Sequence, residues 1–113
     1  MSVGIDESIA VRSEAARLWR AHGRPGNAAV SLARLSLMFM YAARNADAAA
    51  ALREAGSLVA DDPESNAARV VRSCAAMLCL FERDYDKAIA LATPVLAAAE
   101  RERDMAETVA CLK

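Results

Sequence analysis

Aromatic residues, glycine and proline are scarce in this sequence, and their scarcity excludes several fold classes. Only 4% of the 113 positions are aromatic, and the chain has four glycines, three prolines and three cysteines. These counts do not fit collagen, a disulfide-rich mini-protein or a β-sandwich with many turns. By contrast, 56% of the residues are apolar and about a quarter are alanine, which does not fit a disordered tail. The composition therefore predicts a single all-α domain over residues 1–113, large enough to bury a core without disulfides or metals.

The sequence also lacks an excess of charge of either sign. Its 14 basic and 15 acidic residues give a net charge of −1, and the two signs are interspersed, so no basic stripe is available for nucleic acid. The longest uncharged apolar run, residues 35–43, is far too short to cross a bilayer. The N-terminus has no basic segment followed by an apolar one, so we expect no signal peptide. We therefore expect a cytoplasmic protein that binds neither nucleic acid nor a membrane.

Residues that could carry out a reaction are few. His22 is the only histidine, and its place at a predicted helix end suits interaction with the helix dipole better than catalysis. No Gly-x-x-x-x-Gly-Lys-Ser/Thr or Gly-x-Ser-x-Gly motif is present. Cys74, Cys79 and Cys111 lie in apolar helical stretches and are interpreted as reduced core thiols. We therefore expect no enzyme activity, no cofactor and no metal.

Residues that break or cap helices divide the chain into five helices and a short sixth. We expect helices over residues 6–21, 28–44, 46–60, 63–81 and 85–102, followed by a short helix over 105–113. Asn27 is predicted to cap the second helix and Asn45 to end it in a left-handed conformation. Asp62 is predicted to cap the fourth helix, with Pro63 at its first position, and Asp84 is predicted to cap the fifth.

Four of these helices form two copies of a longer unit. Residues 27–60 align with residues 65–98 after a shift of 38 residues, and Ala50 then meets Ala88. In each copy the first helix is apolar nearly all round, whereas the second carries more charge. A helix that is apolar all round is buried on more than one side, as happens when antiparallel helix pairs stack into an array. The pattern therefore predicts an α-solenoid of antiparallel helix pairs, with partial repeats at both ends.

Residues 81–92 resemble the second-helix signature of the tetratricopeptide repeat. Tyr85 supplies the aromatic residue that follows the turn, and Ala88 supplies the small residue three positions later. Ala76 stands where the family has a small residue in the first helix, whereas Arg72 occupies the usual tryptophan position. The resemblance implies a TPR-like fold over roughly residues 27–102.

In a TPR-like array, the first helices of successive pairs line a concave face that binds a partner. Carried onto this chain, the repeat register places seven residues on or near that face: Leu32, Leu35, Phe39, Val70, Ser73, Met77 and Leu80. Such an apolar patch suits an amphipathic helix of a protein or peptide partner. The alternative is that these side chains pack against the protein's own terminal helices.

Residues 8–23, 32–39 and 97–110 further resemble the helical-repeat region of large ATP-binding bacterial transcription regulators of the LuxR type. The resemblance implies a non-catalytic segment for protein–protein interaction or signal sensing. One alternative is a stand-alone chaperone or scaffold for a secretion or other assembly partner, and another is a structural dimer module. Val109 and Leu112 have no following helix to cover them, so we expect self-association through them, as in a homodimer.

Overall fold

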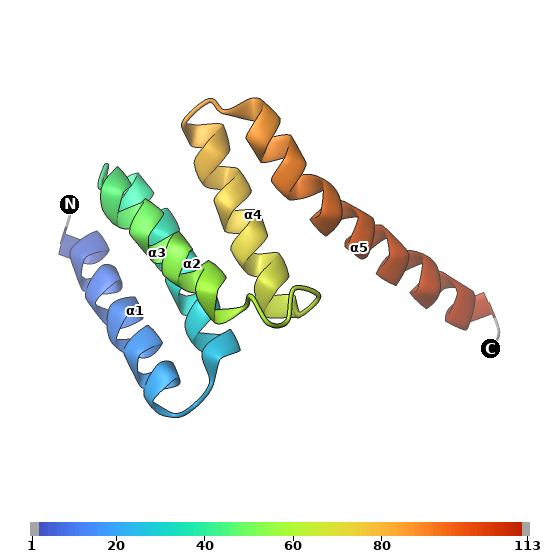
Figure 1. The fold of residues 1–113 in the computed structure, drawn as a ribbon, viewed down its shortest axis with the longest axis horizontal. Helices are drawn as coiled ribbons and strands as arrows, with labels where there is room; N and C mark the ends of the chain where they lie inside the picture. The colour runs from blue at the N-terminus through green and yellow to red at the C-terminus, as the bar shows by residue number, and fades with distance from the viewer. Residues whose placement is uncertain (1–2, 112–113) are drawn as a thin grey trace.

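The computed structural model describes residues 3–111, and this part of the chain is helical without any strand. Five helices follow one another along the chain: α1 (Val3–Ala21), α2 (Pro25–Tyr41), α3 (Asn45–Leu58), α4 (Asn66–Phe81) and α5 (Tyr85–Cys111) (Figure 1). The all-helical class expected from the composition is therefore confirmed for the described residues.

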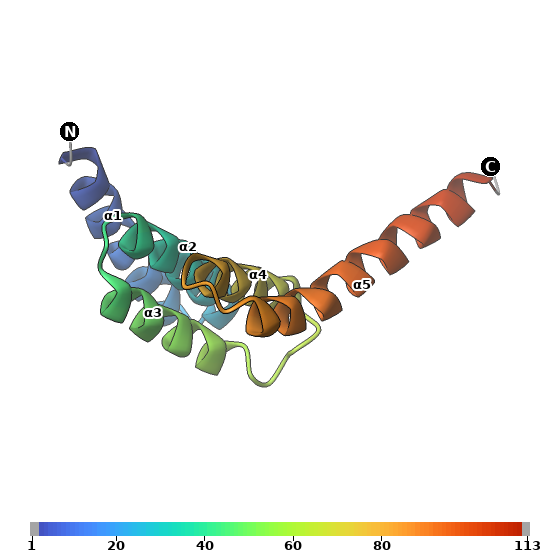
Figure 2. The same cartoon turned by 90° about the horizontal axis from the view of Figure 1, so that it is seen from above.

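Helix α2 occupies the centre of the molecule. It packs against α1, α3 and α4, whereas within the described residues α5 packs only against α4. Figure 2 shows α5 extending away from the other four helices. The molecule is consequently elongated, with principal extents of 51 × 36 × 29 Å.

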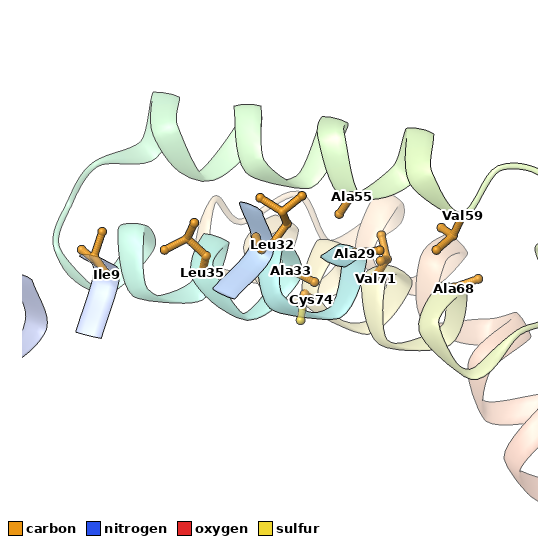
Figure 3. Close-up of a cluster of buried hydrophobic side chains, with 11 residues drawn as sticks. Ile9, Ala29, Leu32, Ala33, Leu35, Ala55, Val59, Ala68, Val71 and Cys74 are labelled. Carbon is orange, nitrogen blue, oxygen red and sulfur yellow. The ribbon is translucent and has the colours of Figure 1, made fainter. Parts of the chain in front are cut away.

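Small side chains line the contacts of α2 with its neighbours. The fully buried positions include alanines on α2 and α3: Ala28, Ala29, Ala33, Ala48 and Ala55. Larger aliphatic residues from α1, α2 and α4, together with Val59 just after α3, complete the main cluster, which is drawn in Figure 3. Because alanine adds so little volume, the helix axes can approach closely, and the separation of two packed helices depends on the side chains between them.

Three of the interhelical turns share one backbone geometry. Gly23, Ala43 and Arg83 have φ values of 72°, 61° and 64°, in the left-handed region. In each turn the next residue donates its N–H to a carbonyl five residues earlier, as Arg44 N–H does to Phe39 O at 2.8 Å. This is the Schellman arrangement, which satisfies carbonyls left free at a helix end. Only one of the three turns uses glycine, so two residues that carry a Cβ are held in a costly conformation.

These turns place the two copies of the unit at a different offset from the one expected. Ala43 and Arg83, the left-handed residues, lie 40 positions apart, and so do Tyr41 and Phe81, the last residues of α2 and α4. The alignment by 38 residues paired Asn45 with Arg83 instead. Because Asn45 is the first residue of α3, the prediction that it ends the second helix in a left-handed conformation is wrong.

Two predicted helix starts are also wrong. Asn27 does not cap α2, because Pro25, whose ring fixes a helical φ, already occupies the first helical position. Asp62 and Pro63 lie in turns before α4, and Ser65 caps that helix by accepting the N–H of Ala68 at 3.1 Å. Ser65 Oγ also donates to the carbonyl of Asp62 at 2.8 Å, so the acidic segment serves as an acceptor for the cap.

The end of the chain contains one helix rather than two. Asp84 caps α5 as predicted, accepting the N–H of Lys87 at 3.3 Å. The helix then continues through Pro94 and through residues 102–105 to Cys111, so the separate sixth helix is wrong. Residues 100–103 are glutamate and arginine in alternation, and both are good helix formers. A charged stretch of this kind is therefore no signal for a break.

The left-handed turn at Ala43 makes a test of the fold possible. Replacing Ala43 with glycine removes the steric cost of a Cβ at positive φ, and we expect Ala43→Gly to raise the free energy of unfolding by about 1 kcal/mol. Urea denaturation with an unchanged m-value measures this effect. The control Ala90→Gly, at an exposed position within α5, should instead lower that free energy by about 0.5–1 kcal/mol. A loss of stability in Ala43→Gly would contradict the turn geometry.

Candidate functional site

An open groove of about 540 Å³ runs over α2 between α1 and α3. Its volume lies in the range of ligand-binding clefts. Three helices contribute its lining: Ser13, Ala16, Arg17 and Arg20 from α1, Leu32, Leu35 and Phe39 from α2, and Asp47, Ala50, Ala51 and Glu54 from α3. We call it the α2 groove.

The floor of the α2 groove is apolar and rigidly supported. Leu32 and Leu35 are 6% and 4% exposed and belong to the main core cluster, whereas Phe39 is half-buried against it. The three residues follow one another at spacings of three and four, so they lie on one face of α2. Figure 3 shows Leu32 and Leu35 on α2, below the ribbon of α3. The groove therefore offers an apolar floor whose position is fixed by core packing.

The walls of the α2 groove carry opposite charges. Arg20 of α1 and Glu54 of α3 form an ion pair that bridges the two walls. Arg17 lies on the same wall as Arg20 and donates from Nε to Glu14 at 3.0 Å. That hydrogen bond lowers the pKa of Glu14, and the same contact raises the pKa of Arg17. Arg17 therefore remains charged beside the apolar floor at neutral pH.

Arg44 fixes the end of the groove floor nearest the α2–α3 turn. Its guanidinium carbon lies 4.7 Å from the centre of the Phe39 ring, within the range of a cation–π contact. The same guanidinium donates from Nε to Asp47 Oδ2 at 2.8 Å. Because Arg44 follows the left-handed Ala43, the turn geometry places one cation between an aromatic floor residue and an acidic wall residue.

The seven residues expected on one concave face lie in two different places in the structure. Leu32, Leu35 and Phe39 lie together in the α2 groove, where Leu32 and Leu35 also pack in the cluster that includes Ile9 and Ala16 of α1. The other four are on α4 and do not line this groove: Val70 is half-buried, and the side chains of Ser73, Met77 and Leu80 are exposed.

The two residues expected to mediate self-association are not described at side-chain level. Val109 belongs to helix α5, but its side chain is outside the described part of the structure, and Leu112 lies outside the described residues.

The walls of the groove were missed by the sequence reasoning. They come from α1 and α3, which carry Ser13, Arg17 and Arg20 on one side and Ala50 and Glu54 on the other. The spacing of three or four between successive wall residues is a helical signal. It identifies a face on each helix, but it does not show that the two faces meet across α2.

The polar chemistry of the described residues is limited. Over the part of the chain with described side chains, no group of three or more His, Cys, Asp or Glu is placed to hold a metal ion. His22 lies in the exposed turn that follows α1. Cys74 and Cys79 are free and buried, which confirms their prediction as core residues. The side chain of Cys111 is outside the described part of the structure. Burial raises the pKa of both the Cys74 and the Cys79 thiol.

No helix within residues 3–111 combines the length and the apolar character that crossing a membrane requires.

The raised thiol pKa values predict slow chemistry at Cys74 and Cys79. In a Cys111→Ser chain, only these two thiols remain, and a higher pKa leaves less of the reactive thiolate at pH 8.5. We expect both thiols to react with Ellman's reagent at least about tenfold more slowly in the folded protein than in guanidinium chloride. Equal rates in the two states would contradict the burial of these side chains.

The Arg20–Glu54 ion pair predicts a small and salt-dependent coupling between α1 and α3. Both side chains are about half exposed, so a double-mutant cycle with Arg20→Ala and Glu54→Ala should give a coupling energy of about 0.2–1 kcal/mol. The coupling should decrease at about 1 M salt because screening is then nearly complete. The Glu14–Arg17 pair, which lies within α1, is the control that does not bridge two helices. A coupling that high salt leaves unchanged would contradict the geometry.

Comparison with known proteins gives no relative of this chain. No protein-family model, no curated protein and no solved structure matches it.

Proposed function

We propose that this chain is a non-catalytic helical-repeat module that binds a protein or peptide partner in the α2 groove. In this proposal the module is a TPR-like α-solenoid of antiparallel helix pairs. It serves as an interaction or signal-sensing segment of a cytoplasmic bacterial transcription regulator of the LuxR type. The assignment to a regulator rests on the sequence resemblance of residues 8–23, 32–39 and 97–110. The assignment to binding rests on the groove.

Equivalent buried positions in the two helix pairs support the repeat architecture. With the offset of 40 residues given by the turns, the small residues Ser36 and Ala48 of the first pair meet Ala76 and Ala88 of the second, and all four are buried. Ala76 and Ala88 are the two positions at which the second copy has the small residues of the tetratricopeptide signature. In Figure 1 the chain also reverses direction at the turns between α1 and α2, α2 and α3, and α4 and α5.

The apolar floor between charged walls is the observation that carries the binding proposal. Leu32, Leu35 and Phe39 lie at helical spacing along the groove, and an amphipathic helix docks with anchors that repeat at three, four and seven residues. The walls supply Arg17 and Arg20 on one side and acidic residues on the other, which suits a peptide with polar edges of both signs.

Display of helix-forming peptides of about 15 residues on phage tests this proposal, because the selection itself identifies sequences that bind. We expect selection on the immobilised chain to enrich peptides that share apolar residues at helical spacing. Ala50→Arg places a long charged side chain on the groove wall without touching the core, because Ala50 is exposed. It should weaken binding of the enriched peptides at least about tenfold, a loss of about 1.4 kcal/mol.

Ala90→Arg is the matched control for Ala50→Arg. Ala90 is the exposed alanine that lies 40 residues further on in α5, outside the groove. It receives the same charge and the same change in helix propensity, so its peptide affinity should equal that of the parent chain. If selection enriches no peptide, or if both variants bind the enriched peptides equally, the groove is not the binding site.

A further inference from the structure

Each wall of the α2 groove contributes charges of only one sign to its lining. The charged lining residues of α1 are Arg17 and Arg20, and those of α3 are Asp47 and Glu54. The floor that α2 supplies between them is apolar. An occupant of the groove therefore meets a positive edge along α1 and a negative edge along α3.

Arg17 is able to bind a second carboxylate from the groove. Its Nε and Nη2 donate to the carboxylate of Glu14, which is not part of the groove lining. Among the side chains that the structure describes, none accepts a hydrogen bond from Nη1 of Arg17. Because a guanidinium carries several N–H donors in a planar fork, Nη1 is free to donate to a partner in the groove while Nε and Nη2 keep Glu14.

The Arg20–Glu54 ion pair crosses the groove above its floor. Phe39 and Asp47 lie together at the end nearest the α2–α3 turn. Helices α2 and α3 run in opposite directions (Figure 1), so the residue seven positions before Phe39 lies level with the residue seven positions after Asp47. These two residues are Leu32 and Glu54. A helix that covers the whole floor therefore has to pass between Arg20 and Glu54, and their ion pair then opens.

The opening of this ion pair determines which charges an occupant must carry on each side. An exposed pair of this kind contributes little to stability, so opening it is not an obstacle in itself. The two charges then lie beside the occupant, and a charge that loses water without gaining a partner is costly. A carboxylate on the α1 side gives Arg20 a new partner, and a cation on the α3 side gives one to Glu54. The reverse arrangement brings like charges together, which is unfavourable.

We infer that the partner of the α2 groove is an amphipathic helix with acidic residues along one edge and basic residues along the other. The inference rests on the function proposed above. The acidic edge faces Arg17 and Arg20 of α1, the basic edge faces Glu54 of α3, and the apolar face covers the floor. Because a helix exchanges its two edges when it is reversed, the charges also fix the direction in which the partner lies.

Two synthetic helix-forming peptides of about 15 residues test this inference. Both carry leucines at helical spacing on one face, and both contain the same numbers of glutamates and lysines. In the segregated peptide the glutamates lie along one edge and the lysines along the other, whereas in the mixed peptide each edge carries both. The two peptides are matched for helicity by circular dichroism, so that their affinities differ only through the placement of charge.

Isothermal titration calorimetry with the full chain measures the two affinities. At low salt we expect the segregated peptide to bind at least about tenfold more tightly than the mixed peptide. At about 1 M salt the two affinities should agree to within about twofold, because charges are then screened. Both peptides should still bind at high salt through their apolar faces, so the contribution of the charges is measured separately from binding itself.

Neutralising one cation of the α1 wall identifies the edge that this wall binds. Arg17→Gln should weaken the segregated peptide about three- to tenfold, and it should have no effect on a segregated peptide whose glutamates are replaced by glutamine. Arg101→Gln, the matched change at an exposed position of α5 outside the groove, should leave every affinity unchanged. Both substitutions are at exposed side chains, so the helical circular dichroism of the chain should remain.

The outcomes distinguish this inference from the proposed function. Equal affinities of the two peptides at low salt would overturn the inference while leaving the groove a binding site. A loss from Arg17→Gln that persists with the peptide without glutamates would overturn it too, because the acidic edge would then not face α1. If neither peptide binds, or if Ala50→Arg leaves their affinities unchanged, the proposed function fails and the inference fails with it.

Discussion

The close packing of α2 against its neighbours through alanine is the constraint on which the rest of the structure depends. Ala28, Ala29 and Ala33 on α2 are fully buried, and so are Ala48 and Ala55 on α3. At such positions the neighbouring helix leaves no room for a larger side chain, and overpacking forces side chains and backbones to shift. The one fully buried polar side chain among the described residues, Ser36, keeps to this limit by donating to the carbonyl of Ala33. The abundance of alanine in the sequence therefore explains how one helix, α2, can contact three others.

The α2 groove is a result of the same arrangement. Because α1 and α3 both pack on α2, they flank it, but within the described residues they do not pack on each other. The space between them exposes part of the face of α2 that carries Leu32 and Phe39. Among the side chains that the structure describes, the ion pair of Arg20 with Glu54 is the one polar contact that joins the two walls, and an exposed pair of this kind contributes little to stability. The separation of the walls is therefore governed by their packing on α2.

The helices could be predicted from the sequence, but several of their ends could not. The cap of α5 has a local signal in the sequence, because the side chain of Asp84 is an acceptor that lies three residues before a free backbone N–H. The prediction that Asp84 caps this helix is therefore correct. The left-handed residues Ala43 and Arg83 have none, since nothing in either side chain distinguishes them from helical neighbours. Missing them gave a repeat offset of 38 instead of 40. Where two acceptors compete, as at Asp62 and Ser65, the choice depends on how the connection to α3 closes.

The floor of the α2 groove could be predicted from the sequence, but its walls could not. Periodicity shows which residues share a face of one helix, and it correctly grouped Leu32, Leu35 and Phe39. It does not show which helix lies over that face. The residues on α4, such as Met77 and Leu80, were grouped with them because both sets belong to first helices of a pair. In the structure, α4 covers a different side of α2 from the one that α1 and α3 leave open.

The single contact of α5 with the rest of the molecule has a consequence for the order of assembly. Every pair of packed helices is close in sequence, with at most one helix between them, so folding closes only short loops, and a topology of this kind folds rapidly. Helices α2, α3 and α4 each pack against at least two other helices, whereas within the described residues α1 packs only against α2 and α5 only against α4. Detachment of α5 breaks its contacts with α4 alone, so it is a less costly opening than the separation of α2 from its three neighbours. Amide hydrogens of α5 can therefore exchange with solvent when α5 alone detaches, whereas those of α2 exchange only when the whole domain unfolds.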